Sequence, residues 1–266
     1  MTTNWGYCQG NGPQTWSEIF PAASGNYQSP VDIKPVDLKD LSCNKRLEWK
    51  YTPENATDVT NTGHGWKVGI KQGGSSLSGG PLKSTYELAQ FHCHWGETDD
   101  QGSEHTIDGK TFAGELHLVH WNSSKYPTFE EAAKHHDGFC VLGLFLKSGA
   151  KNEELEKVIA ELNKIEYKDQ KTSVSPIDPT NLLPKNGGCG YYTYQGSLTT
   201  PPCLECVIWI VFKEPIEVSP EQLKAFRRLK FHCKEECCEC NDCDGSIKNN
   251  FRPTLPLGQR EVLEGR

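Results

Sequence analysis

Two segments of the chain carry histidines in a pattern that limits how they can fold. Residues 87–96 read Glu-Leu-Ala-Gln-Phe-His-Cys-His-Trp-Gly, and residues 115–121 read Glu-Leu-His-Leu-Val-His-Trp. Aromatic and branched side chains recur there at a period of two, which predicts β-strands. Because residues two apart on a strand share a face, His92 and His94 should point to the same side of a sheet. A neighbouring strand could bring His117 to that side as well.

These three histidines would form a metal site of the catalytic kind. Three neutral imidazoles leave the fourth position of a tetrahedral Zn²⁺ open, as catalytic zinc sites do. Gln90 shares a face with His92, and Glu115 shares one with His117. We expect both side chains to accept hydrogen bonds from the ligands and so to select which imidazole nitrogen faces the metal. A His-x-His pair alone would be weaker evidence, since such pairs often serve only packing.

Further motifs occur along the chain in a characteristic order. They are Gln-Ser-Pro-Val-Asp-Ile at 28–33, Asn-Thr-Gly-His-Gly at 61–65, Gly-Ser-Glu-His-Thr at 102–106, Ser-Leu-Thr-Thr-Pro-Pro at 197–202 and Asn-Phe-Arg-Pro at 250–253. Together with the two histidine segments, they resemble the α-class carbonic anhydrases. The resemblance extends from Trp5 to about Pro256.

The resemblance implies an α+β fold that is mainly β. A large, twisted, mostly antiparallel central sheet would carry a few peripheral helices and a conical active-site cavity. We expect one domain over residues 1–266, a length that buries about three quarters of the unfolded surface. Apolar runs predict buried strands at 139–146 and 206–212. Helical spacing and capping residues predict helices at 153–165, from Ser219 onward and at 129–136.

The resemblance also implies an activity and a cofactor. The reaction would be reversible hydration of carbon dioxide to bicarbonate and a proton, through hydroxide on one catalytic Zn²⁺ ion. His92, His94 and His117 would hold the ion, and Gln90, Glu115 and Asn250 would support them. Simple anions and unsubstituted aromatic sulfonamides would be inhibitors.

Thr199, Glu104 and His64 would be the catalytic residues beside the metal. If the Thr199 hydroxyl donates to the Glu104 carboxylate, which only accepts, it must accept from the zinc-bound hydroxide and so orient it. His64 would carry the proton away, because imidazole titrates near neutral pH. By resemblance its surroundings are Tyr7, Thr62 and Lys67. The charge of Lys67 would lower the pKa of His64.

Carbon dioxide has no dipole and needs an apolar niche. The resemblance assigns substrate binding to Leu198, Thr199, Thr200, Val119, Val141, Val207 and Trp209. Simple core packing would account equally well for the apolar members of this set.

Charge and composition limit the kinds of partner that the chain could bind. A net charge of −7 and a pI near 5.7 give no basic surface for nucleic acid or an anionic membrane. The apolar runs are too short to cross a bilayer. We expect a monomer that meets only a small-molecule substrate, carbon dioxide or bicarbonate, with no nucleic-acid partner and no membrane insertion.

The expected location is the cytoplasm. The first residues show neither a basic start nor an apolar stretch, although a secreted form whose signal had been removed would look the same. Secreted relatives typically join a cysteine near position 23 to one at position 203. Here Cys203 is present but Ala23 replaces its partner, which favours a reducing compartment.

A cysteine-rich stretch at about 231–245 departs from the family pattern. We interpret it as a surface loop insertion. Free thiols, disulfides and thiolate metal binding are all open for its cysteines, which are Cys233, Cys237, Cys238, Cys240 and Cys243. Metal buffering by this loop is one alternative function. The other is a catalytically silent binding protein, because the fold that the resemblance implies has relatives that lost a metal ligand.

Overall fold

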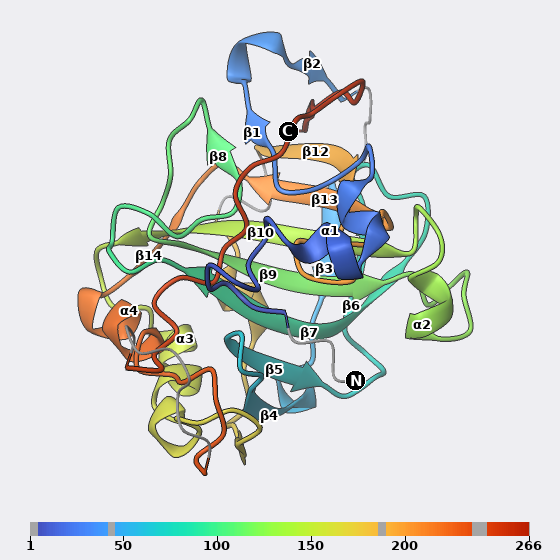
Figure 1. The fold of residues 1–266 in the computed structure, drawn as a ribbon. Helices are drawn as coiled ribbons and strands as arrows, with labels where there is room; N and C mark the ends of the chain where they lie inside the picture. Colours follow the sequence, from blue (N-terminus) through green and yellow to red (C-terminus); the bar gives the residue numbers. More distant parts are fainter. Residues whose placement is uncertain (1–4, 42–45, 186–189, 236–243, 266) are drawn as a thin grey trace.

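The computed structural model describes residues 5–41, 46–185, 190–235 and 244–265. A thirteen-stranded sheet runs through the centre of the molecule (Figure 1). Its main path has the spatial order β11 (Lys171–Ser173), β4 (Ala56–Asn61), β5 (Trp66–Ile70), β7 (Tyr86–Trp95), β9 (Gly114–Trp121), β10 (Phe139–Ser148), β13 (Val207–Phe212), β12 (Tyr191–Gly196), β15 (Leu263–Gly265) and β2 (Lys39–Asp40).

The remaining strands lie beside this path. The large sheet also includes β3 (Leu47–Lys50), β6 (Ser76–Gly79) and β14 (Ile216–Val218), and a separate small sheet pairs β1 (Asp32–Ile33) with β8 (Thr106–Ile107). Most neighbours are antiparallel, but β10 runs parallel to both β13 and β14, and β15 runs parallel to β2. The predicted architecture, a large, mostly antiparallel sheet with few helices, is therefore confirmed.

Helices are short and peripheral. The α-helices are α1 (Trp16–Ile19), α2 (Phe129–Ala132), α3 (Glu153–Ile159) and α4 (Pro220–Phe226). Single 3₁₀ turns occur at η1 (Pro21–Ser24), η2 (Pro35–Asp37), η3 (Pro53–Asn55), η4 (Leu162–Lys164) and η5 (Pro179–Leu182). In Figure 1, α3 and α4 lie together at one side of the sheet and α2 lies at the other.

The predicted helices exist, but two of them end early. The helix expected over 153–165 stops at Ile159 and continues only as the η4 turn. The one expected over 129–136 stops at Ala132, where the chain folds back so closely that a Cβ at Gly138 would lie 1.7 Å from the Ala132 oxygen. The start at Ser219 is confirmed by a capping box with Gln222.

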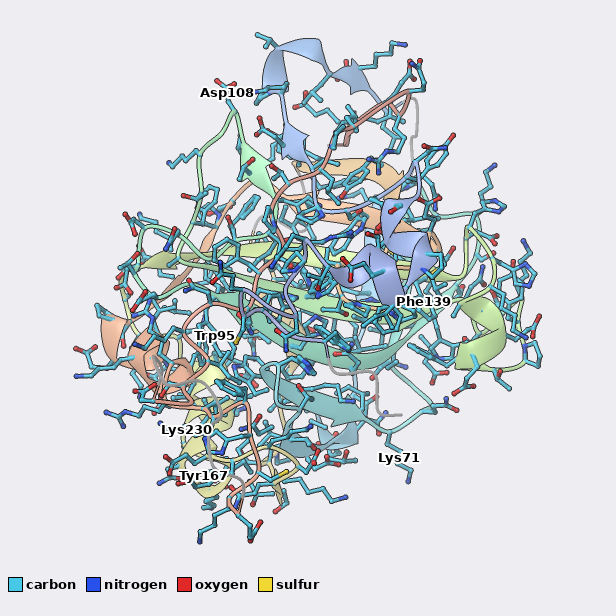
Figure 2. All side chains as sticks on the ribbon, viewed as in Figure 1. Lys71, Trp95, Asp108, Phe139, Tyr167 and Lys230 are labelled. Atoms are coloured by element: carbon cyan, nitrogen blue, oxygen red, sulfur yellow. The ribbon has the colours of Figure 1, made fainter. Side chains whose placement is uncertain are left out.

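Strand alternation divides the core between the two faces of the sheet. On β9, Leu116 and Leu118 join the larger apolar cluster, whereas Val119 and Trp121 join the smaller one. His117 shares the face of Val119 because the two residues are two apart. The histidines therefore lie on the side of the smaller cluster. Figure 2 shows the side chains on the ribbon, including Trp95 of the larger cluster and Phe139 of the smaller one.

The cysteine-rich stretch at about 231–245, interpreted from the sequence as a surface loop insertion, is only partly described. Its base is closed by pairing between Lys230 and Ser246 and by a hydrogen bond from the Phe231 nitrogen to the Gly245 oxygen. Cys233 is half-buried, and its Sγ lies 3.8 Å from Asp169 Oδ2. The other loop cysteines, Cys237, Cys238, Cys240 and Cys243, lie outside the described residues. Within the described ranges, no helix is long and apolar enough to cross a membrane.

Candidate metal centre and active site

The register of two strands brings the three histidines together. Strands β7 and β9 are antiparallel, with His92 opposite His117 and His94 opposite Glu115. One ring nitrogen from each histidine falls within a group whose members all lie within 4.8 Å of one another. The Nε2 atoms of His92 and His94 are 3.2 Å apart. Tetrahedral zinc with Zn–N bonds of about 2.0–2.1 Å requires about 3.3–3.4 Å between ligand nitrogens, so the group fits zinc.

Each ligand ring is held by one oxygen acceptor. The Nδ1 of His92 lies 2.8 Å from Gln90 Oε1, and the Nε2 of His117 lies 2.8 Å from Glu115 Oε1. An oxygen acceptor requires the facing nitrogen to carry the hydrogen, which leaves the other nitrogen of the neutral ring as a lone-pair donor. The remaining nitrogens, Nε2 of His92 and Nδ1 of His117, belong to the shared space between the rings.

Asn250 supports His94 through its backbone. The Nδ1 of His94 lies 2.7 Å from the Asn250 carbonyl oxygen. The Asn250 side chain holds that carbonyl in place, because its Oδ1 accepts from the Trp95 nitrogen and its Nδ2 donates to the His64 carbonyl. One residue thus links the ligand strand β7, the C-terminal segment and the turn that carries His64.

Burial keeps the ligand rings neutral. It lowers the pKa of His94 to about 3, and it also lowers the pKa values of His92 and His117. Protonation of His94 or His117 would lower the pKa of His92 further. Neutral imidazole is the form that binds metal, and His92 stays partly exposed while the other two are buried.

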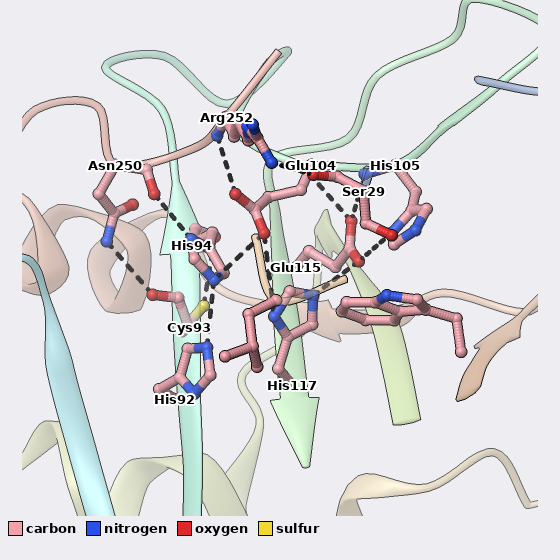
Figure 3. A network of polar contacts seen from close by, with 12 residues as sticks. Ser29, His92, Cys93, His94, Glu104, His105, Glu115, His117, Asn250 and Arg252 are labelled. Carbon is pink, nitrogen blue, oxygen red and sulfur yellow. Dashed lines mark hydrogen bonds and ion pairs between the residues drawn. The ribbon is translucent and has the colours of Figure 1, made fainter. Parts of the chain in front are cut away.

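Glu104 lies against the ring nitrogens that point into the space shared by the three histidines (Figure 3). Its Oε1 accepts a hydrogen bond of 2.8 Å from the Arg252 backbone nitrogen. Its Oε2 is 3.3 Å from His94 Nε2 and 3.9 Å from His117 Nδ1, yet it has no donor at full hydrogen-bond geometry. A buried carboxylate oxygen without a donor, beside converging lone pairs, is the environment that a bound cation would complete.

Thr199 is the nearest expected partner of Glu104. Burial and the charge of Glu115 raise the pKa of Glu104, and hydrogen bonding from the buried Thr199 side chain opposes this rise. Since Oε2 lacks a well-aligned donor, we regard the Thr199 contact as weak in this structure. The two side chains are nevertheless adjacent.

The comparison with known families agrees with this geometry. Residues 11–266 match the sequence model of the family described as eukaryotic-type carbonic anhydrase. The chain belongs to this family. The match covers almost the whole chain, and hydration of carbon dioxide is the reaction general to the family.

His105 is a site residue that sequence reasoning missed. Its Nδ1 lies 2.7 Å from Glu115 Oε1, and Glu115 Oε2 accepts from the backbone nitrogens of Glu104 and His105. Burial opposes ionisation, but the charges and hydrogen bonds of His105 and His117 hold the pKa of Glu115 well below its usual range. No spacing rule links residues 105 and 115, because the contact depends on how the intervening loop folds back.

A second group that could hold a metal consists of His105, Glu115 and His117. Its atoms are already engaged, since Glu115 Oε1 accepts from both rings. We therefore regard this group as the support of the ligand His117.

The apolar residues expected to bind substrate gather beside the histidines. Val141 pairs with Val119 on one side and with Trp209 on the other. The Trp209 ring lies 4.8 Å from the His117 ring. The smaller core cluster contains these residues and Val207, and half-exposed Leu198 packs against it. Thr200 closes the adjacent turn by accepting from the Cys203 nitrogen.

His64 lies in the predicted turn. Its ring stacks on Trp5 at 3.7 Å between centroids, and its Nε2 is 2.8 Å from the Trp5 carbonyl oxygen. Thr62 closes the turn by donating to the Gly65 carbonyl and accepting from the His64 nitrogen. Positive φ angles at Gly63 and Gly65 allow this tight path.

The charges around His64 differ from the expectation. Burial lowers the pKa of His64, and the neighbouring cation that lowers it further is Lys168. Lys67, which was expected to act on His64, instead lowers the pKa of His92, the residue opposite it on β7. Tyr7 lies near Glu104: burial and then the charge of Glu104 raise the pKa of this tyrosine.

Proposed function

We propose that this chain is a zinc-dependent carbonate dehydratase, which hydrates carbon dioxide reversibly to bicarbonate and a proton. The observation that carries the proposal is the convergence of three neutral imidazoles beside the buried Glu104–Thr199 pair. One catalytic Zn²⁺ would be held by His92, His94 and His117.

Zinc in this site would supply a nucleophile at neutral pH, because it lowers the pKa of coordinated water to about 7, the value established for carbonic anhydrase itself. The residues of the chain have three tasks. Gln90, the Asn250 carbonyl and Glu115 orient the rings. The Thr199 hydroxyl would donate to Glu104, which would leave its oxygen lone pairs to orient the attacking group. The Thr199 backbone N–H would meet a substrate oxygen.

The apolar niche would receive carbon dioxide. Val119, Val141 and Trp209 are adjacent on neighbouring strands, with Val207, Leu198 and Thr200 completing the wall. Their packing beside His117 supports this role, since a substrate without a dipole gains most from an apolar surface close to the reacting atoms.

His64 would transfer the released proton to solvent. It lies in a turn that Asn250 ties to the ligand His94, and it is only partly buried. Tyr7 and Thr62 would shape its surroundings. A lowered pKa favours release of the proton from imidazole to buffer over its retention.

The proposal includes a small-molecule substrate, a monomeric state and a cytoplasmic location. Cys203 is a free, buried thiol, and Ala23 stands where secreted relatives carry its cysteine partner, which supports a reducing compartment. A silent binding protein is disfavoured, since all three ligands, Thr199 and Glu104 are retained.

Stopped-flow measurement of carbon dioxide hydration by the zinc-loaded protein tests the proposal. Rapid hydration that disappears on zinc removal and returns on zinc addition is expected. A zinc-loaded protein that leaves hydration at the uncatalysed rate would support the silent binding protein instead.

A further inference from the structure

Ser29 is a fully buried residue at which hydrogen bonds from three other residues meet. Its nitrogen donates to Ser197 Oγ at 2.9 Å, and its Oγ accepts from the Ser197 nitrogen at 3.0 Å. The same Oγ lies 2.9 Å from the Tyr194 hydroxyl, and the Ser29 carbonyl accepts from Arg252 Nη1 at 2.9 Å. Every polar atom of Ser29 is therefore engaged.

The first branch leads from Ser29 to a metal ligand. The Tyr194 hydroxyl lies 2.5 Å from His105 Nε2, and His105 Nδ1 lies 2.7 Å from Glu115 Oε1. Glu115 in turn holds His117. Hydroxyls donate and accept at once, so these contacts form a continuous chain from Ser29 to the His117 ring.

The second branch leads to the segment that carries Thr199. The reciprocal pair of hydrogen bonds clamps Ser197 onto Ser29, two residues before Thr199. Ser197 also accepts from the Trp209 indole through its carbonyl. The packing is tight, because a Cβ at Gly196 would lie 2.1 Å from Ser29 Oγ.

The third branch leads to Glu104. Arg252, whose guanidinium holds the Ser29 carbonyl, donates its backbone nitrogen to Glu104 Oε1 at 2.8 Å. The three branches thus end at His117, Thr199 and Glu104. The proposed reaction requires these groups to be held in the correct position relative to one another.

We propose that Ser29 is a positioning residue that couples the orientation of the His117 ring to the placement of Thr199 and Glu104. This inference rests on the proposed function. Buried polar networks strengthen one another in a low dielectric, and an unsatisfied member is costly. Loss of Ser29 Oγ would leave the Tyr194 hydroxyl and the Ser197 nitrogen each short of a partner, so the strain would reach both the metal ligand and the Thr199 segment.

The test uses two variants with matched controls. Ser29→Ala removes the shared Oγ, and Tyr194→Phe cuts only the branch to His117. Ser75→Ala removes another buried serine hydroxyl, which accepts from the Thr52 nitrogen. Tyr51→Phe removes another buried tyrosine–histidine hydrogen bond, between Tyr51 and His120 Nε2. Neither control residue contacts the site groups in the described structure.

Three quantities are measured for each zinc-loaded variant: zinc release to a chelator, kcat/KM for hydration and the thermal midpoint. Ser29→Ala should release zinc about 10-fold faster and lose about 10-fold in kcat/KM, whereas Tyr194→Phe should mainly speed zinc release. The double variant should release zinc no faster than the stronger single variant, because both changes break one chain. The controls should shift only the thermal midpoint.

Zinc release and kcat/KM of Ser29→Ala that both match those of Ser75→Ala would overturn the inference. If Ser29→Ala fails to fold, the rates of zinc release of Tyr194→Phe and Tyr51→Phe are compared instead. This comparison decides whether the branch to His117 exists. A wild-type protein that binds zinc but does not hydrate carbon dioxide would contradict the proposed function. It would not contradict the inference about Ser29, because the comparison of zinc release requires no turnover.

Discussion

At the scale of single residues, one acceptor per histidine prepares the site for metal. Gln90, the Asn250 carbonyl and Glu115 each accept a hydrogen bond from one ring nitrogen. Burial keeps the rings neutral. The partners of His92 and His117 follow from period-two alternation. The partner of His94 comes from residue 250, and only the resemblance indicated it.

Replacing His94 by Ala should abolish carbon dioxide hydration and lower zinc affinity by orders of magnitude, because a fixed ligand is lost. Zinc affinity is measured by chelator competition, and hydration by stopped flow. His120→Gln is the control, since His120 is buried on β9 but faces Tyr51. Retention of full activity by His94→Ala would show that these histidines are not the ligands.

Replacing His64 by Ala should lower kcat in weak buffer far more than kcat/KM, because proton release follows the chemical step. Added imidazole should restore much of the lost kcat. His136→Ala, which removes an exposed histidine, should change neither quantity. An unchanged kcat for His64→Ala in weak buffer would mean that protons leave by another route.

At the scale of elements, the alternation of apolar residues predicted the strands well, and capping residues predicted the helix starts well, because both depend on local contacts. The four strands around the histidines, β7, β9, β10 and β13, begin within one residue of their predicted starts. Helix ends were less predictable, because α2 ends where tight packing against Gly138 intervenes. The roles of His105, Ser29 and Arg252 were not predictable from spacing, since their contacts join segments far apart in the chain.

Replacing the cysteines of the insertion, from Cys233 to Cys243, by Ser should leave kcat/KM for hydration nearly unchanged. The base of the insertion is closed by Lys230 and Ser246, and the catalytic groups lie on other segments. Zinc stoichiometry is measured on the same samples, since thiolates that bind metal would add zinc beyond one ion per chain. A large loss of activity at unchanged thermal stability would contradict this independence.

At the scale of the whole molecule, the central sheet buries titratable side chains, so the free energy of unfolding depends on pH. Burial lowers the pKa of His120, which is fully buried on the face away from the site, to about 3. An unfolded histidine has a pKa near 6.5, so below that pH the unfolded chain binds a proton that folded His120 does not. The free energy of unfolding therefore falls as the pH drops from 6.5 toward 3.

The size of this effect can be measured with metal-free protein, so that metal loss does not contribute. From pH 6.5 to 5, wild type should lose about 1.7 kcal/mol more than His120→Gln, because the slope rises from about 0.7 kcal/mol per pH unit at pH 6.5 toward about 1.4 at pH 5. Urea unfolding at a series of pH values gives both curves. Identical slopes for the two proteins would mean that His120 is protonated in the folded state.

The central claim is that one zinc ion on His92, His94 and His117 makes this chain a carbon dioxide hydratase. The most direct test measures metal content and hydration rate on the same sample, with the cysteines of the insertion replaced by Ser. The account predicts one zinc per chain and fast hydration that rises in proportion to zinc as the metal-free protein is titrated. One tightly bound zinc per chain with hydration at the uncatalysed rate would contradict it.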